Sequence, residues 1–352
     1  MSPLAQRRWS QFRKNGRAYG ALWIFLTLWI FLTLFTLSLF AEFIANDKPI
    51  LVYHQSQLFI PVLFDYSEQD LGGELPSAAN YWDPNVQKLI RGSDGWMLWP
   101  PVPYHFRTPD MYLSGPAPTS PDTTHWLGTD DAGKDTFARL IYGFRLSVLF
   151  GITLTLISAT IGVIVGGLQG YFGGLVDLIG QRFVEIWTGL PILIILIILS
   201  SIVEPSFFWL LGCLAAFSWM SVVGVVRAEF LRTRNFEYVR AATALGDTHL
   251  SIMLRHVLPN AMTAALTFLP FILSGAITSL TALDFLGFGL PAGSASLGEL
   301  LNQGKRNLQA PWLGLTGFVT VGIMLTLLIF IGEGIRDAFD PRKTISASGD
   351  RS

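Results

Sequence analysis

Residues 237–260 read Glu237-Tyr-Val-Arg-Ala-Ala-Thr-Ala-Leu-Gly-Asp-Thr-His-Leu-Ser-Ile-Met-Leu-Arg-His-Val-Leu-Pro-Asn260. This polar, positively charged and helix-forming segment lies between two long apolar segments. Connections between neighbouring helices are usually only a few residues long. A connection this long and this regular in its pattern therefore indicates a role of its own.

The composition places the chain among membrane proteins. Hydrophobic residues make up 51% of it and charged residues 14%, with a mean hydropathy of +0.46. Soluble domains typically carry about 25% charged residues. The one cysteine, Cys213, lies in an apolar run. It excludes a disulfide framework and a cysteine metal site, and we expect it to be a small buried hydrophobic residue.

Six segments are long and apolar enough to cross a bilayer, which takes about 20 residues per helix. They are residues 19–40, 144–168, 183–203, 207–226, 262–283 and 313–335. The first is too long and too aromatic for a signal peptide and precedes no small-residue cleavage site, so we expect an uncleaved anchor. The sequence thus predicts an all-α polytopic membrane protein with six transmembrane helices.

The basic residues predict the orientation. Residues 7–17, 227–255 and 336–351 each hold four or five Lys or Arg, and six spans place all three segments on one side. The positive-inside rule assigns that side to the cytoplasm, so both termini are expected there. We expect a cytoplasmic N-terminus with the first helix (1–41), a periplasmic insert (42–142), a five-helix core (143–340) and a cytoplasmic tail (341–352).

The insert differs in composition from the spans. It is rich in Pro, Gly, Tyr, Trp and Asp, as residues 95–106 and 113–122 show. Proline and glycine favour short strands and irregular coil over helices. The aromatic content argues against disorder, so we expect a small ordered cap outside the membrane. Two interpretations stay open: a decoration specific to the family, or a docking platform for an extracytoplasmic partner.

The basic loop 227–260 predicts two short helices. Arg240, Ala241, Ala242 and Leu245 fall within about one and a half helical turns, and the alanines are expected to form a small flat face that another protein can approach. Gly246 is expected to end this first helix, because glycine readily takes the left-handed conformation there.

A second helix is expected after that glycine. Asp247 or Thr248 is a candidate N-cap for a helix that runs through Leu254. Pro259 is expected to mark a turn into the fifth span. These residues are also compatible with an ordinary helix hairpin that anionic lipid stabilises.

The spacing within this loop resembles a known family motif. Ala241-Ala242, three residues, Gly246, eleven residues and then Leu258-Pro259 resemble the EAA loop of bacterial ABC importer permeases, which receives force from a separate ATPase. The resemblance implies that the coupling residues are Arg240, Ala241, Ala242, Leu245, Gly246, Leu258 and Pro259. Arg240 and His256 depart from the pattern, which usually has an acidic and an aliphatic residue there.

Three further segments, residues 125–147, 283–291 and 332–342, are similar to peptide permeases. With the loop, they identify the chain as a member of the dipeptide and oligopeptide ABC permeases, of MetI-like fold. A narrower resemblance, carried by Ala-Asn-Asp-Lys-Pro at 45–49 and by the aromatic insert, is to C-type permeases of oligopeptide and microcin C importers. It implies an inner-membrane heterodimer with a second permease, an ATP-binding cassette ATPase, a periplasmic peptide-binding protein and a peptide substrate.

The sequence gives no sign of catalysis or of a cofactor. Gly304-Lys305 lacks the upstream glycine and the following hydroxyl of a phosphate-binding loop. The five histidines show no metal-ligand spacing, and nothing indicates nucleic-acid binding. Ionisable residues are nearly absent at mid-span, which argues against an ion-coupled secondary peptide transporter. That transporter, and a membrane scaffold or receptor that uses the insert, remain the alternatives.

Two features of the spans suggest packing and motion. Gly162, Gly166 and Gly170 recur every four residues in the second span, which suits close helix packing, with a substrate-lining role as a secondary possibility. Pro191 is expected to kink the third span and to serve as a pivot. Asp177 and Glu185 flank that span and are expected at a hydrated edge.

Overall fold

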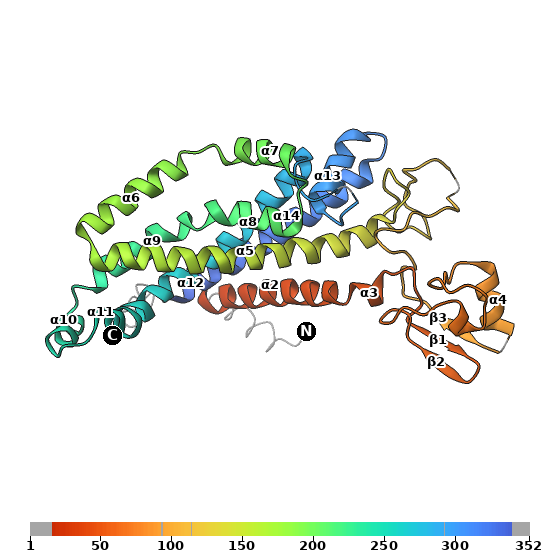
Figure 1. The fold of residues 1–352 in the computed structure, drawn as a ribbon, viewed down its shortest axis with the longest axis horizontal. Helices are drawn as coiled ribbons and strands as arrows, with labels where there is room; N and C mark the ends of the chain where they lie inside the picture. Colours follow the sequence, from red (N-terminus) through yellow and green to blue (C-terminus); the bar gives the residue numbers. More distant parts are fainter. Residues whose placement is uncertain (1–15, 93, 114, 292, 340–352) are drawn as a thin grey trace, which may run out of the picture.

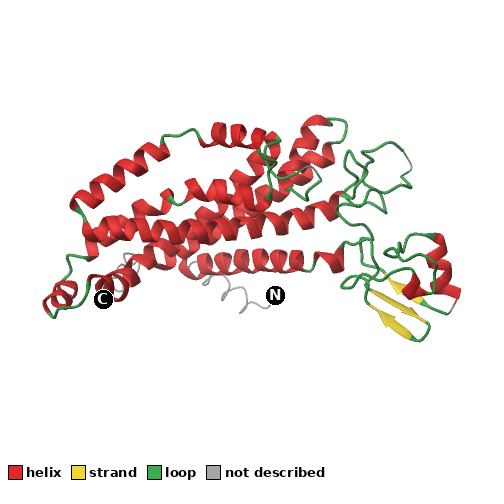
Figure 2. Cartoon of the chain, in the orientation of Figure 1, coloured by secondary structure: helices red, strands yellow, loops and turns green. Residues whose placement is uncertain are grey.

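A computed structural model describes residues 16–339 except 93, 114 and 292. Its helices run roughly along one axis, with a small strand-containing unit at one end and the short helices α10 and α11 at the other (Figures 1 and 2). The basic N-terminal residues 7–14 and the predicted tail 341–352 lie outside the described residues.

The predicted helical, polytopic fold is confirmed. Five helices are long and apolar enough to cross a membrane, or six if a bent pair counts as one span. Four spans contain one long helix each, and the fourth span in chain order joins two shorter helices without a wide bend. They are α2 (Gly16–Leu39), α5 (Thr136–Phe172), α8 (Phe207–Ser218) with α9 (Met220–Thr233), α12 (Leu258–Leu286) and α14 (Pro311–Phe339).

The third predicted span is broken. It consists of α6 (Gly174–Thr188) and α7 (Ile192–Ile202), which meet at an angle of 66°. The expected kink therefore lies at residues 189–191, but the span begins well before the predicted residue 183. None of the residues of α6, all of which are described, is buried. The pair runs along the outer side of the bundle (Figure 1).

Glycines bring α5 and α9 into close contact. A Cβ added at Gly162 would lie 2.5 Å from the Cβ of Val222, and one at Gly170 would lie 2.5 Å from the Cβ of Phe230. At Gly166 the added Cβ would meet the backbone oxygen of Val223 at 2.8 Å. Small residues at helix interfaces in membranes permit such close backbone approach. The structure thus places all three glycines against α9.

The insert between α3 (Ala41–Ile44) and α5 contains a compact module. Its strands are β1 (Leu51–His54), β2 (Gln57–Phe59) and β3 (Trp96–Leu98), antiparallel in the order β2-β1-β3. The amide of Ile50 donates to the carbonyl of Leu98 over 2.7 Å, so the two ends of the module meet. Its side chains form a separate core that includes Val52, Tyr81 and Ile90.

The expectation of strands and coil missed one helix in this module, besides the 3₁₀ turn η1 (Gln69–Leu71). The helix α4 (Pro84–Gly92) begins with a proline and buries Val86 and Ile90. Proline is tolerated in the first turn, and residues four apart share one helix face. The general richness in proline and glycine concealed this local pattern.

The connection between the fifth and sixth spans holds a second helix that was not predicted. In α13 (Leu297–Arg306), the hydroxyl of Ser296 accepts from the amide of Glu299 at 3.3 Å and the side chain also bonds Asp284. Leu297 and Leu300 are buried in the core shared with α14. Serine before a helix with glutamate three residues later is a recognisable N-terminal signal.

Replacing Gly166 by leucine tests the α5–α9 contact. The new side chain meets backbone that cannot move aside, so we expect the free energy of unfolding to fall by about 1–3 kcal/mol. Thermal unfolding in detergent measures the change. The matched control is Gly224→Leu, since a Cβ at Gly224 meets nothing within 4 Å. Equal effects of the two substitutions would contradict the assigned contact.

Candidate functional site

The loop helix α10 (Glu237–Ala244) ends as the sequence predicts. Gly246 has a φ of +85°, and its amide donates to the carbonyl of Thr243 at 3.1 Å. The amide of Asp247 donates to the carbonyl of Ala242 at 3.2 Å. This pair of bonds satisfies carbonyls that a helix end otherwise leaves free, and it needs a left-handed residue at its centre. Gly246 therefore sets the direction in which the chain leaves α10.

The second half of the loop differs from the prediction. Thr248 caps α11 (His249–Ser251) by accepting from the amide of Ser251 at 3.3 Å, as one of the two expected caps. The helix then continues through a π-helical segment, η2 (Ile252–Val257), directly into α12. The expected end at Leu254 and the expected turn at Pro259 are wrong. Pro259 lies two residues after η2, within the continuous run that leads into α12.

The alanine pair does not form one flat face. Ala241 is exposed, whereas Ala242 is only 7% exposed and packs in a cluster with Val239, Ile252 and Val257. Consecutive residues of a helix point about 100° apart, so neighbours seldom share a face. Ala242 therefore holds α10 on the rest of the loop, and Ala241 is free to meet another protein.

Three exposed leucines stand at the end of the molecule formed by α10 and α11. Leu245 is 87% exposed, Leu250 65% and Leu254 53%. We call these residues the leucine tip. Arg240 lies exposed on the same short helix as Ala241. A group of exposed large apolar side chains next to a charged one is typical of a surface that binds another protein.

Polar contacts fix the shape of this loop. Tyr238 accepts from the amide nitrogen Nδ2 of Asn260 at 2.7 Å and donates to the carbonyl of His256 at 3.3 Å. His256 also has its Nε2 3.5 Å from the Oδ2 of Asp247. Asp247, which follows Gly246, and His256, three residues before Pro259, thus meet across the loop. His256, a departure from the family pattern, contributes to this internal contact.

The loop is also tied to the spans. Arg234 donates to the carbonyls of Gly170 at 3.2 Å and Tyr171 at 3.1 Å, at the C-terminal end of α5. The hydroxyl of Tyr171 lies 2.9 Å from the Nδ1 of His249. These contacts join α5 to both sides of α10.

A further ion pair joins α9 to the broken span. Arg227 binds both carboxylate oxygens of Asp177, with an Nη2–Oδ2 distance of 2.7 Å. Asp177 is thus paired, and Glu185 pairs with exposed Arg182. Both lie within α6 rather than beside the span, and their place at a hydrated edge stays a prediction. The spacing of the basic residues gives no sign that Arg227 reaches Asp177.

The opposite end of α5 carries a buried histidine. The Nδ1 of His125 lies 2.8 Å from the Oδ2 of Asp135, and its Nε2 lies 3.2 Å from the Oδ2 of Asp110. Asp135 also caps α5 by accepting from the amide of Ala138 at 2.7 Å. Burial opposes a charge on the ring, but the two carboxylates outweigh it and raise the pKa of His125. Histidine thus fastens the insert to the start of α5.

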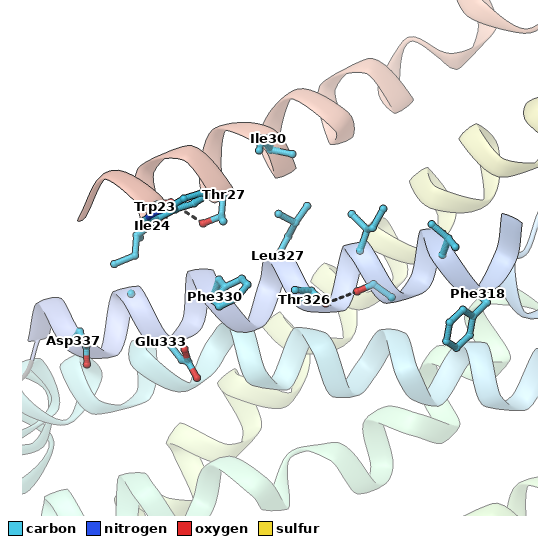
Figure 3. Close-up of a pocket in the computed structure, with 14 residues that line it drawn as sticks. Trp23, Ile24, Thr27, Ile30, Phe318, Thr326, Leu327, Phe330, Glu333 and Asp337 are labelled. Carbon is cyan, nitrogen blue, oxygen red and sulfur yellow. Dashed lines mark hydrogen bonds between the residues drawn. The ribbon is translucent and has the colours of Figure 1, made fainter. Parts of the chain in front are cut away.

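Several grooves open on the bundle, among them two of about 700 Å³ and 560 Å³. The larger of these two lies between α2 and α14 (Figure 3). Trp23, Ile24 and Ile30 face it from α2, and Glu333 and Asp337 lie towards one end of it on α14. The smaller, of about 560 Å³, lies where α6 and α7 break and is bordered by α8, α9 and α12. In residues 16–339, gaps aside, no group of three His, Cys, Asp or Glu is arranged to hold a metal.

Several apolar spans, a loop surface at one end and an ordered insert at the other define a polytopic membrane protein. The chain belongs to the family described as "Binding-protein-dependent transport system inner membrane component", whose model matches residues 137–345. The resemblance seen in the motifs is thereby confirmed.

Similar proteins support the narrower resemblance as well. The chain is 58% identical over 345 residues to the "Inner membrane ABC transporter permease protein YejE" of Escherichia coli (strain K12), covering 98% of this chain and 99% of that protein. It is 54% identical over 367 residues to the "Peptidoglycan transport system permease protein YejE" of Agrobacterium fabrum, covering 97% and 94%. The "Dipeptide transport system permease protein DppC" of Bacillus subtilis is 36% identical over 225 residues, 63% of this chain and 70% of that one. All three are transport components rather than enzymes by description.

The buried histidine predicts a pH dependence of stability. The pKa of His125 lies above its ordinary value of 6.5, so its charged form stabilises the fold fully below about pH 6.5. This contribution is lost as the pH rises through the raised pKa. We expect the midpoint of thermal unfolding to fall over that range and the fall to be smaller in His125→Gln. The same slope in the wild-type protein and in His125→Gln would contradict the assignment.

Proposed function

We propose that the chain is a permease subunit of an ATP-driven peptide importer and forms half of its translocation pathway. The observation that carries this proposal is the loop 237–259, which presents exposed side chains outward and is fixed to three spans inward. The similar proteins named as peptide permeases support the substrate class. The partners are a second permease, an ATP-binding cassette ATPase and a periplasmic peptide-binding protein.

The exposed side of the loop is the contact with the ATPase. A cleft on the ATPase receives three side chains of the loop. Arg240 contributes a charge and Leu245 an apolar contact, while the small Ala241 lets the ATPase approach the backbone closely. Ala242 and Leu258 act from inside the loop by holding α10 against the start of α12. Pro259 lies exposed at that start, next to Leu258. Gly246 fixes the direction of the chain between the two halves.

The ties to the spans convert a displacement of the loop into a motion of the bundle. When ATP binding draws two ATPase subunits together, α10 moves with the subunit that holds it. Arg234 transfers this motion to α5, and the unbroken run from α11 transfers it to α12. The pathway then changes from inward-facing to outward-facing and accepts peptide from the binding protein. The break at Pro191 is the pivot at which α6 and α7 change their angle.

The orientation follows from the positive charges. The basic segments lie in the cytoplasm with both termini, and the loop with them. The insert, at the far end of the bundle in Figure 1, is then periplasmic.

We further propose that the insert is a docking platform. From Glu42 to Asp135 the chain holds 13 acidic and 5 basic side chains, a formal charge of −8, against −1 for the whole chain. Met111 and Tyr112 are 83% and 79% exposed on it. Acidic surfaces with exposed aromatic and methionine side chains suit a partner with a basic face. The periplasmic peptide-binding protein is the partner that must reach the insert.

Replacing Gly246 by valine tests the coupling loop. A β-branched residue strains a backbone at φ +85°, while the space around the position is open. We expect normal insertion into the membrane, because the spans keep their apolar length, and a loss of peptide-stimulated ATP hydrolysis of about tenfold or more. The rate of ATP hydrolysis is measured with and without peptide in the complex of the permease with its ATPase, reconstituted into membranes.

The control for this substitution is Gly246→Asn, since asparagine tolerates the left-handed conformation and should keep most of the activity. A scaffold or a secondary transporter would show no ATPase response to either change. Loss of insertion in Gly246→Val would mean that the loop serves the fold alone.

Deletion of residues 51–98 tests the docking platform. The ends of this module meet at Ile50 and Leu98, so a short Gly-Ser link can replace it and leave His125 with its partners. We expect ATP hydrolysis without binding protein to stay within about twofold, while stimulation by loaded binding protein falls, since the deletion removes 6 acidic and 2 basic side chains and docking depends on complementary charge. Full stimulation after the deletion would show that this module is a decoration.

A further inference from the structure

The groove at the break of the third span contains the elements of a peptide-binding site, and we propose that it is a subsite of the translocation pathway for peptide segments with uncharged side chains. We call it the break groove. This inference rests on the proposed function as a peptide permease.

An irregular stretch of backbone borders the break groove. On one side α6 ends at Thr188 and α7 begins at Ile192, and both residues line the groove. On the other side α8 passes into α9 at Trp219, whose backbone stays helical, with Ser218 and Met220 lining the groove. Non-helical backbone at membrane depth is tolerated where protein covers it or where it lines a water-filled cavity. Discontinuous helices of this kind commonly form the substrate sites of transporters.

The polar groups of the break groove are hydroxyls with spare acceptor capacity. Thr188 donates to the carbonyl of Val184 at 2.7 Å, Ser218 to that of Leu214 at 2.7 Å and Ser221 to that of Ser218 at 2.8 Å. A hydroxyl whose proton is used in this way still accepts hydrogen bonds through its oxygen. Peptide amides are donors, so these oxygens match the backbone of any peptide. Recognition through the backbone tolerates many side-chain sequences.

The remaining surface is aromatic and apolar. Phe217, Phe268 and Phe271 line the break groove, and among its described lining residues none is ionisable. A charged side chain that leaves water needs an opposite charge, whereas a neutral one gains from apolar burial. The break groove therefore favours neutral segments. The α2–α14 groove differs, because continuous helices border it and two carboxylates lie at its end.

Cysteine labelling tests the occupancy of the break groove. Gly275 lines it, is exposed, and would place a Cβ with nothing within 4 Å, so Gly275→Cys should fold. Gly322→Cys in the α2–α14 groove is equally open and serves as the control. Both are made in Cys213→Ala, which removes the one natural thiol, and are expressed with the partner subunits. We expect saturating pentaalanine to slow maleimide labelling at Gly275→Cys by about tenfold and at Gly322→Cys by less than about twofold, following the difference in occupancy.

A charge introduced into the same groove tests its selectivity. Ser279, another lining residue, is replaced by aspartate, with Ser279→Asn as the neutral control. Two peptides are compared at Gly275→Cys: pentaalanine, and the same peptide with a central lysine. The ratio of protection by the lysine peptide to protection by pentaalanine should be about tenfold higher in Ser279→Asp than in Ser279→Asn. Ser221→Cys replaces the labelling site if Gly275→Cys does not assemble.

Three results would overturn the subsite: equal labelling with and without peptide, equal protection in the two grooves, or unchanged preference in Ser279→Asp. Labelling needs no ATP hydrolysis. If peptide slows labelling in the break groove but Gly246→Val leaves ATP hydrolysis unchanged, the subsite is supported and the proposed coupling is refuted. If Gly246→Val abolishes the stimulation but peptide does not slow labelling, the coupling is supported and the subsite is refuted.

Discussion

The close contact of α5 with α9 is the constraint on which the other features depend. In a bilayer, lipid tails are as apolar as leucine side chains, so helices associate through close packing and polar contacts rather than through burial from water. The glycines at 162, 166 and 170 allow that packing, and Phe230 and Val222 fill the space they leave. Because α9 leads directly into α10, its position on α5 also decides where the loop surface lies.

The helix α5 connects the two ends of the molecule. Its 37 residues span roughly 55 Å, well beyond the hydrocarbon core of about 30 Å. At its start, Asp135 joins it to His125 in the insert, and at its end Gly170 and Tyr171 join it to Arg234. The broken third span has the opposite character, since α6 has no buried residue and meets α7 at 66°. One long continuous helix and one jointed span thus lie in the same bundle.

The sequence predicted the features that depend on composition and on local backbone chemistry. Apolar length located the spans to within several residues, and the left-handed preference of glycine located the end of α10. Prediction from the sequence was less successful where tertiary contacts determine the position of a side chain. Nothing in the spacing shows that Arg227 reaches Asp177 or that Asn260 reaches Tyr238, and adjacent alanines at 241 and 242 look equivalent until a cluster buries one of them. The helices α4 and α13 were not predicted although both carry start signals, because the proline and glycine around them hide the local helix pattern.

The π-helical segment η2 has a consequence for the register of the loop. A π turn holds more residues than an α turn, so Ile252–Val257 contains surplus chain between the leucine tip and the regular part of α12. Five residues of an α-helix turn through about the same angle as these six, since each α residue turns about 100°. Loss of a single residue there would therefore shorten the run but leave the leucine tip at nearly the same angle to the fifth span. Insertion of a residue into a neighbouring α-helical turn, by contrast, would turn the tip by about 100°.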